Sequence, residues 1–220
     1  LSPKEISKLM NENKITYMIT VPLFLKTLKK NFDLKLKTSS DFNKSVYKFC
    51  SSITSMRGNI FLNRLIFCGV RKHLGFTLKG YICGSAPLDR ELEKFYESIG
   101  VPVFQGYGLT ETSPTISINN NKHRRIGSVG KVLSSFKVKI SNQGEILVKG
   151  DSIMKGYYRN KTETDKVLDP EGWLYTGDIG HLDKDGYLYI TGRCKNLIVL
   201  PGGKKVHPEE VEIAVSHSDA

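Results

Sequence analysis

The chain has 220 residues, of which 39% are hydrophobic and 25% are charged. This balance is typical of a folded globular protein and excludes a disordered or fibrous chain. The sequence contains no run of about 18 uncharged apolar residues, so a transmembrane helix is not expected. The four cysteines form no CxxC pair. Their scattered positions argue against a zinc site and favour a reducing compartment such as the cytoplasm.

The net charge of +11 lies in the first third of the chain. Residues 1–80 contain 15 Lys and Arg against 4 Asp and Glu, whereas residues 81–220 contain 18 of each sign. A basic field attracts nucleic acid, anionic membranes or polyanionic substrates. No zinc finger or aromatic RNA-binding motif accompanies this charge, so we expect no nucleic-acid partner. The plainer interpretation is a solvated surface rich in Lys and Asn.

Residues 44–74 are the candidate for peripheral contact with a membrane. Within them, residues 60–74 carry apolar side chains beside Arg64, Arg71 and Lys72. A basic amphipathic helix of this kind can rest on a lipid surface. A helix that faces the protein core is the preferred alternative.

Strands and helices are expected to alternate in the first half of the chain. In order, we expect a helix from Pro3 capped by Ser2, a strand over 15–21, a short helix over 22–28, helices within 42–74 with a break at Gly58, a strand over 79–83, a helix over 88–99 and a strand over 101–104. This alternation predicts a parallel sheet. Ligands of such sheets bind beyond the carboxyl ends of the strands, where the loops 84–87 and 105–112 are expected.

Short strands separated by turns replace this alternation from Gly127 onward. We expect strands over 136–140, 145–149, 174–182, 187–191 and 197–200, a short helix near 162–167, a turn at Gly202-Gly203 and a final helix from Pro208. The Asp185-Gly186 pair is a hairpin signal. The second half therefore predicts a small antiparallel sheet or partial barrel.

Several common catalytic motifs are absent from the sequence. It contains no GxxxxGK[ST] phosphate loop, no GxSxG nucleophile elbow and no HExxH pair. The five histidines are isolated. Hydrolase triads and metalloprotease sites are therefore excluded.

Four groups of motifs stand in order along the chain. They are Gly84-Ser85-Ala86-Pro87-Leu88; Gly106-Tyr107-Gly108-Leu109-Thr110-Glu111-Thr112; Gly144-Glu145-Ile146 with Gly156-Tyr157-Tyr158 and Tyr175-Thr176-Gly177-Asp178; and Gly192-Arg193-Cys194-Lys195 with Val206-His207-Pro208-Glu209-Glu210. In this order and spacing they resemble the adenylate-forming superfamily of acyl-CoA synthetases, nonribosomal-peptide adenylation domains and luciferases. Within that superfamily, the stretch from Arg71 to Leu88 looks like the long-chain fatty acyl-CoA synthetase branch.

The resemblance implies an α/β fold. The chain would be the second half of an adenylate-forming large domain, in which a parallel α/β sheet layer is followed by a small antiparallel β-barrel-like subdomain, together with the start of the small C-terminal domain. The implied boundaries are 1–125 for the α/β part, 126–193 for the β-rich subdomain, and 194–220 for the hinge and a truncated small domain.

The resemblance also implies a two-step ligase reaction. A fatty acid carboxylate, expected to be long-chain, attacks the α-phosphate of ATP and gives acyl-AMP and pyrophosphate. The thiol of CoA then displaces AMP and gives acyl-CoA. The implied partners are the fatty acid, ATP and CoA, with AMP as product and Mg²⁺ as the metal; no protein partner can be inferred.

Thr110 and Glu111 form the sharpest catalytic pair in the sequence. Attack on a phosphate needs a donor against the phosphate oxygens and a carboxylate for Mg²⁺. By resemblance, Thr110 contacts phosphate and Glu111 holds the metal, and Arg193 is the third catalytic residue. The plainer interpretation of Thr110 and Glu111 is a cap at the end of a loop.

Tyr107 offers a flat face for a purine. The glycines on either side, Gly106 and Gly108, let the backbone come close to a ligand. By resemblance, Tyr107 stacks on adenine. The other side of the base would be lined by Gly84, Ser85 and Ala86. A buried core tyrosine is the alternative for Tyr107.

Asp178, Arg193 and Lys195 complete the expected site. A carboxylate can accept hydrogen bonds from both ribose hydroxyls, and by resemblance this is the role of Asp178. The guanidinium of Arg193 suits ribose or phosphate oxygens, and the resemblance places it at the nucleotide. Lys195 matches the hinge between the large and small domains, which need only absorb a backbone rotation. The plainer interpretation of Asp178 is an ordinary Asp in a turn, and that of Lys195 is a Lys on the surface.

Two parts that the family needs are expected outside these residues. A phosphate loop rich in Ser, Thr and Gly should precede Leu1, and a catalytic Lys should follow Ala220. We therefore expect an internal piece of a longer enzyme that does not complete catalysis alone. Two alternatives stay open: a fatty acyl-AMP ligase that delivers to a carrier protein, and a catalytically dead homologue that acts as a binding module.

Overall fold

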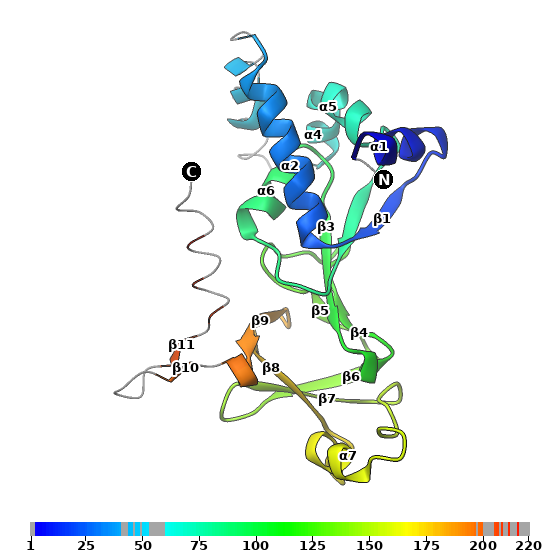
Figure 1. Cartoon of the computed structure of the whole chain (residues 1–220), viewed down its shortest axis with the longest axis vertical. Coiled ribbons are helices and arrows are strands. Elements are labelled where there is room, and N and C mark those ends of the chain that lie inside the picture. The colour runs from blue at the N-terminus through cyan, green and yellow to red at the C-terminus, as the bar shows by residue number, and fades with distance from the viewer. Residues whose placement is uncertain are drawn as a thin grey trace. The chain divides into compact units, whose positions relative to one another are not determined.

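The computed structural model describes residues 3–40, 60–196 and 198–199, together with scattered residues between 44 and 52 and between 205 and 215 (Figure 1). The chain divides into two compact units, Leu1–Gln105 and Gly106–Ala220. The domain boundaries expected at 125/126 and 193/194 stay predictions. Ser2, Gly58, the Gly202-Gly203 turn and most of the final helix lie outside the described residues.

The first unit alternates helices and strands as expected. Its elements are α1 (Pro3–Glu12), β1 (Tyr17–Thr20), α2 (Pro22–Lys37), α4 (Ile60–Ile66), α5 (Cys68–Leu74), β2 (Gly80–Cys83), α6 (Arg90–Ser98) and the first part of β3 (Val103–Gly108). β2 pairs in parallel with β1 on one side and with β3 on the other. The predicted parallel α/β sheet is therefore confirmed, and Figure 1 shows its helices in blue to green around these strands.

Helix α6 illustrates how the sequence produces this packing. Its apolar residues Leu92, Phe95 and Tyr96 recur at helical spacing and are buried, as is Ile99 just after it. Asp89 begins the helix, because its carboxylate accepts hydrogen bonds from the backbone N–H groups of the first turn. Removing each such large side chain from water stabilises the unit by about 1.5–3 kcal/mol.

Helix α2 runs to Lys37, well beyond the expected end at Leu28. The reason is tertiary: Phe32 packs against Phe95, with ring centroids 5.5 Å apart, and partly buries itself against the core of the unit. The intervening Lys residues are good helix formers and do not interrupt the helix. Helix propensity alone could not show that the second half of α2 would pack against the core of this unit.

The basic residues of α4 and α5 bind the backbone of their own unit. Arg71 is buried and donates to the carbonyl oxygens of Phe76 and Leu78. Arg64 donates to the carbonyl oxygens of Gly100 and Lys79. Two of the three cations behind the membrane hypothesis thus have structural roles, which favours the core-facing alternative. None of the helices within the described part of the chain has the length and apolar character to cross a lipid bilayer.

The second unit is rich in short strands. It contains the end of β3 and then β4 (Thr115–Ile118), β5 (Lys131–Val132), β6 (Phe136–Ile140), β7 (Glu145–Gly150), α7 (Lys161–Val167), β8 (Leu174–Leu182), β9 (Leu188–Arg193), β10 (Ile198–Val199) and β11 (Lys205–Val206), with 3-10 turns η1 (Thr110–Thr112) and η2 (Cys194–Asn196). Strands β6 to β9 form an antiparallel four-stranded sheet in chain order. The expected antiparallel sheet and the short helix before β8 are confirmed.

Strand β3 extends through the glycine motif, which the sequence had suggested as a loop from Gln105. Gly106 and Tyr107 pair antiparallel with β4, which in turn pairs with β5; neither of these two strands was expected. A Cβ atom at Gly108 would lie only 1.6 Å from the carbonyl oxygen of Pro114. The missing side chain therefore permits the close backbone approach at the end of β3.

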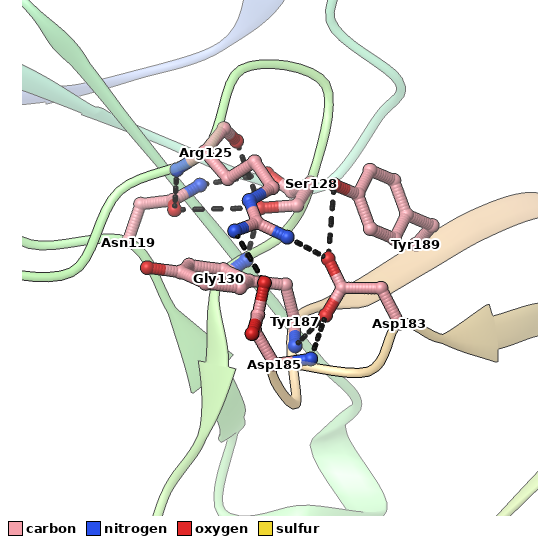
Figure 2. Close-up of polar contacts among 8 residues, drawn as sticks. All are labelled: Asn119, Arg125, Ser128, Gly130, Asp183, Asp185, Tyr187 and Tyr189. Carbon is pink, nitrogen blue, oxygen red and sulfur yellow. Dashed lines mark hydrogen bonds and ion pairs between the residues drawn. The ribbon is translucent and has the colours of Figure 1, made fainter.

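A polar cluster joins β5 and its preceding loop to the hairpin between β8 and β9. The guanidinium of Arg125 binds the carboxylates of Asp183 and Asp185, as Figure 2 shows. It also lies 4.4 Å from the ring centroid of Tyr187. The backbone N–H of Leu188 also donates to the carbonyl oxygen of Gly130 at 2.9 Å. These contacts hold the β4–β5 strand pair against the four-stranded sheet formed by β6 to β9.

Candidate functional site

Asp178 lies at the centre of the candidate site in the second unit. The residue is only 4% exposed. Its Oδ2 accepts a hydrogen bond from the Tyr107 hydroxyl at 2.7 Å, and its Oδ1 lies 3.2 Å from Nε of Arg193. Asp178 and Arg193 are direct partners across the β8–β9 pair. The structure thus brings together three residues that the family resemblance assigned to one nucleotide site. We call these three residues the Asp178 cluster.

The backbone before Asp178 is fixed by side chains of the same motif group. Thr176 donates from its hydroxyl to the carbonyl oxygen of Ile146 at 2.8 Å and accepts from the N–H of Asp178 at 3.2 Å. Gly177 has a φ of 73° and donates to a carboxylate oxygen of Glu145 at 2.9 Å. The Gly-Glu-Ile and Thr-Gly-Asp motifs therefore act together to orient Asp178.

Tyr107 reaches Asp178 from β3. Burial, and then the charge of Asp178, raise the pKa of Tyr107, so its hydroxyl stays protonated and donates. This bond was not expected, because the sequence argument used only the ring of Tyr107. Stacking of that ring on adenine stays a prediction.

Thr110 and Glu111 lie in η1, directly after β3. Thr112, which is buried, supplies the loop cap: it accepts from the N–H of Leu109 at 3.0 Å and donates to the carbonyl oxygen of Pro114 at 2.8 Å. The turn therefore does not need the side chains of Thr110 and Glu111, which weakens the alternative interpretation of this pair as a cap.

Glu111 has one side-chain contact that sequence reasoning missed. The hydroxyl of Tyr157 donates to its Oε1 at 2.9 Å. The pKa of Tyr157 is raised, and this hydrogen bond is the largest cause, followed by burial. Tyr157 belongs to one of the quoted motifs, but nothing in its local pattern pointed to Glu111.

The remaining expected residues occupy the ends of strands. Gly84, Ser85 and Ala86 follow the last residue of β2 in the first unit, and Ser85 has a left-handed φ of 69°. Lys195 lies exposed in η2, two residues after the end of β9. Their roles at the nucleotide and at a hinge stay predictions.

The donor set fits a metal that is shared with a phosphate. Among the residues that the structure describes, no group of three or more His, Cys, Asp or Glu could hold a metal ion. Mg²⁺ commonly keeps several waters and binds one or two carboxylates together with substrate phosphates. The single carboxylate of Glu111, in an accessible turn, is compatible with that kind of site.

Sequence relatives include ligases that act on fatty acids. The chain is 35% identical over 181 residues to the long-chain-fatty-acid–CoA ligase FadD15 of Mycobacterium bovis, covering 82% of this chain and 30% of that protein. It is 39% identical over 157 residues to the human long-chain-fatty-acid–CoA ligase ACSBG2, covering 69% of this chain and 24% of that protein. The chain thus spans less than a third of the length of these two relatives.

Solved structures with a similar fold include a CoA synthetase and MatB. O-succinylbenzoate CoA synthetase from Bacillus subtilis, in complex with ATP and magnesium, matches with a TM-score of 0.71 at 27% identity, over 99% of this chain and 40% of that one. Apo MatB from Rhodopseudomonas palustris matches with a TM-score of 0.66 at 26% identity, over 96% and 37%. The expected α/β fold with its β-rich second part is therefore confirmed. The sequence model of the AMP-binding enzyme family matches residues 1–158, and the chain belongs to this family of adenylate-forming enzymes.

Proposed function

We propose that the chain contributes the adenosine- and metal-binding residues of an ATP-dependent fatty acid–CoA ligase. The enzyme would activate a long-chain fatty acid as acyl-AMP, releasing pyrophosphate, and transfer the acyl group to CoA, releasing AMP. The observation that carries this proposal is the buried Asp178 carboxylate, held between the Tyr107 hydroxyl and Arg193. The names of the ligase relatives support the choice of substrate.

The Asp178 cluster suits a ribose with two neighbouring hydroxyls. Each carboxylate oxygen has two lone pairs, so Oδ1 and Oδ2 can each accept one more hydrogen bond. Bonds to an ionised acceptor are shorter and roughly twice as strong as neutral ones. The side chain of Arg193 is 65% exposed, so part of its donor fork remains available for a ribose or phosphate oxygen.

Thr110 and Glu111 suit the reacting phosphates. Thr110 is an exposed residue, and its hydroxyl can donate to an oxygen of the α-phosphate as negative charge builds on it. Glu111 supplies the carboxylate that would hold Mg²⁺ against the triphosphate. When bound, the metal neutralises phosphate charge and so favours departure of pyrophosphate.

The ligands of one structural relative match the steps of this reaction. The Bacillus subtilis enzyme has been solved with AMP, with ATP and magnesium, and with an acyl-adenylate intermediate. These are a product, the nucleotide substrate with its metal, and the kind of intermediate that the proposed reaction needs. They support ATP, AMP and Mg²⁺ as the ligands of the corresponding residues here.

Pyrophosphate exchange that depends on fatty acid tests the proposal. In the complete gene product that contains this sequence, we expect exchange into ATP when Mg²⁺ and a long-chain fatty acid are present. Glu111→Gln should lower the exchange rate by about 100-fold or more, as expected when electrostatic stabilisation of the reacting phosphate is removed. Glu91→Gln is the matched control, because Glu91 forms an exposed ion pair with Lys94 on the surface of α6.

Identification of the acylated product, in a reaction supplied with both CoA and a carrier protein, separates the two kinds of ligase. An acyl-CoA product identifies a CoA ligase, whereas transfer of the acyl group only to the carrier protein identifies a fatty acyl-AMP ligase. A well-folded wild type without exchange would favour a binding module. Exchange that is unchanged in Glu111→Gln would contradict the role given to Glu111.

A further inference from the structure

Two adjacent tyrosines in the loop between β7 and α7 differ sharply in their surroundings. Tyr157 is 38% exposed and its hydroxyl donates to Oε1 of Glu111 at 2.9 Å. Tyr158 is 85% exposed and lies under the guanidinium of its neighbour Arg159, 5.1 Å from the ring centroid. Only the first of these two hydroxyls reaches the catalytic turn.

The loop that carries Tyr157 is attached to η1 at two further points. The N–H of Met154 donates to the carbonyl oxygen of Glu111 at 2.8 Å. The hydroxyl of Ser113 donates to the carbonyl oxygen of Ser152 at 3.1 Å. The hydrogen bond from Tyr157 is therefore one of several contacts between η1 and the loop that follows β7. Both the backbone and the side chain of Glu111 take part in these contacts.

Tyr157 is itself held on its other side by α7. Its backbone N–H donates to the hydroxyl oxygen of Thr164 at 2.9 Å, and that hydroxyl donates to the carbonyl oxygen of Asn160 at 2.8 Å. Gly156 has a φ of 143°, and a Cβ there would lie 2.9 Å from Cγ2 of Thr164. This close approach fixes the direction in which the ring of Tyr157 leaves the backbone.

We propose that Tyr157 is a positioning residue for the metal-binding carboxylate. Its hydroxyl holds Oε1 of Glu111, so that Oε2 is presented to Mg²⁺ bound with the triphosphate. This inference rests on the proposed function, because it takes Glu111 as the metal ligand.

The physical advantage of such a contact is orientation. A glutamate in an open turn has several rotamers, and ordering it on metal binding costs conformational entropy. A hydrogen bond from Tyr157 orders the carboxylate before the metal arrives, and the ionised acceptor makes that bond strong.

Calorimetric titration of ATP at a series of Mg²⁺ concentrations tests this role in the complete gene product. In Tyr157→Phe we expect the half-saturating Mg²⁺ concentration for ATP binding to rise about tenfold, the effect of losing one hydrogen bond to a charged group. Binding of ATP in EDTA should not change, because Tyr157 acts only on the metal ligand. Tyr158→Phe is the matched control and should behave as wild type in both conditions.

A double-mutant cycle with Glu111→Gln identifies the route of the effect. If Tyr157 acts through Glu111, Tyr157→Phe should add little to the Mg²⁺ dependence of Glu111→Gln. A merely structural role would instead lower ATP binding in EDTA and the thermal unfolding midpoint together. That result would overturn the inference.

The remaining outcomes are also decisive. If wild type shows magnesium-dependent ATP binding while Tyr157→Phe equals Tyr158→Phe, the positioning role is wrong and the proposed function stands. A half-saturating Mg²⁺ concentration that falls in Tyr157→Phe would show that the tyrosine competes with the metal, which also overturns the proposal. Absence of magnesium-dependent binding in the wild type would remove the proposed function and this inference together.

Discussion

The Asp178 cluster and the Glu111 turn, both in the second unit, hold their carboxylates in different ways. Asp178 is nearly inaccessible, and each of its carboxylate oxygens already has a partner from another strand. Glu111 lies in a short 3-10 turn, with one oxygen bound to Tyr157. The difference teaches that the fold builds the proposed ribose side of the site, whereas it only orients the carboxylate of the proposed metal side, which bound ligands would complete.

Gly108 offers the largest disturbance of both regions, because it ends the strand of Tyr107 and precedes the turn of Glu111. Gly108→Ala would place a Cβ 1.6 Å from the Pro114 carbonyl oxygen, and backbone must move to relieve this contact. Overpacking of this kind typically costs about 1–3 kcal/mol, and more where backbone is the obstacle. We expect a marked fall in the thermal unfolding midpoint.

A glycine with free space around it provides the control. Nothing lies within 4 Å of a Cβ built at Gly69 in α5, and alanine favours helix over glycine by about 1 kcal/mol. Gly69→Ala should leave the midpoint unchanged or raise it. Equal unfolding midpoints in Gly108→Ala and Gly69→Ala would show that β3 does not need its close approach to Pro114. The contrast drawn between the Asp178 cluster and the Glu111 turn would then lose its structural basis.

Lowering the pH should have a smaller effect on the thermal unfolding midpoint. The effect should come from the polar cluster of Arg125, Asp183 and Asp185, which supports the β8–β9 hairpin. Burial alone would raise the pKa of Asp183, but hydrogen bonds from the Tyr187 backbone N–H and from Arg125 outweigh it and lower this pKa. A carboxyl with a lowered folded pKa stabilises the fold above its unfolded value, about 3.9, and that contribution is lost as pH falls through the folded value.

The unfolding midpoint of wild type should therefore fall as the pH is lowered below about 4. In Asp183→Asn this part of the pH dependence should disappear. Asp165→Asn is the control, because Asp165 forms an exposed pair with Lys161 along one helix, and such pairs contribute little. If wild type and Asp183→Asn depend on pH in the same way, Arg125 does not hold the hairpin through this carboxylate.

The sequence predicted those features that depend on local pattern. Apolar spacing identified α6, alternation identified the parallel strands, and turn residues identified the strands around Asp185. The resemblance to adenylate-forming enzymes assigned Asp178 and Arg193 to one site, and the structure places them opposite each other on neighbouring strands.

The missed features depend on contacts between distant positions. The length of α2 follows from the packing of Phe32 on Phe95, and the extension of β3 follows from its pairing with β4. The hydroxyl of Tyr107 meets Asp178 across 71 positions, and that of Tyr157 meets Glu111 across 46. No periodicity encodes such pairs, so only the three-dimensional structure reveals that each carboxylate has a tyrosine donor.

Binding of AMP without metal tests the contrast between the two carboxylates most directly. Calorimetric titration of the complete gene product with AMP in EDTA would compare wild type with Asp178→Ala and Glu111→Gln. We expect wild type and Glu111→Gln to bind AMP equally, and Asp178→Ala to bind at least tenfold more weakly, since hydrogen bonds to a charged acceptor are worth about 1.5–3 kcal/mol. Equal binding by Asp178→Ala and wild type, or loss of AMP binding in Glu111→Gln, would contradict this account.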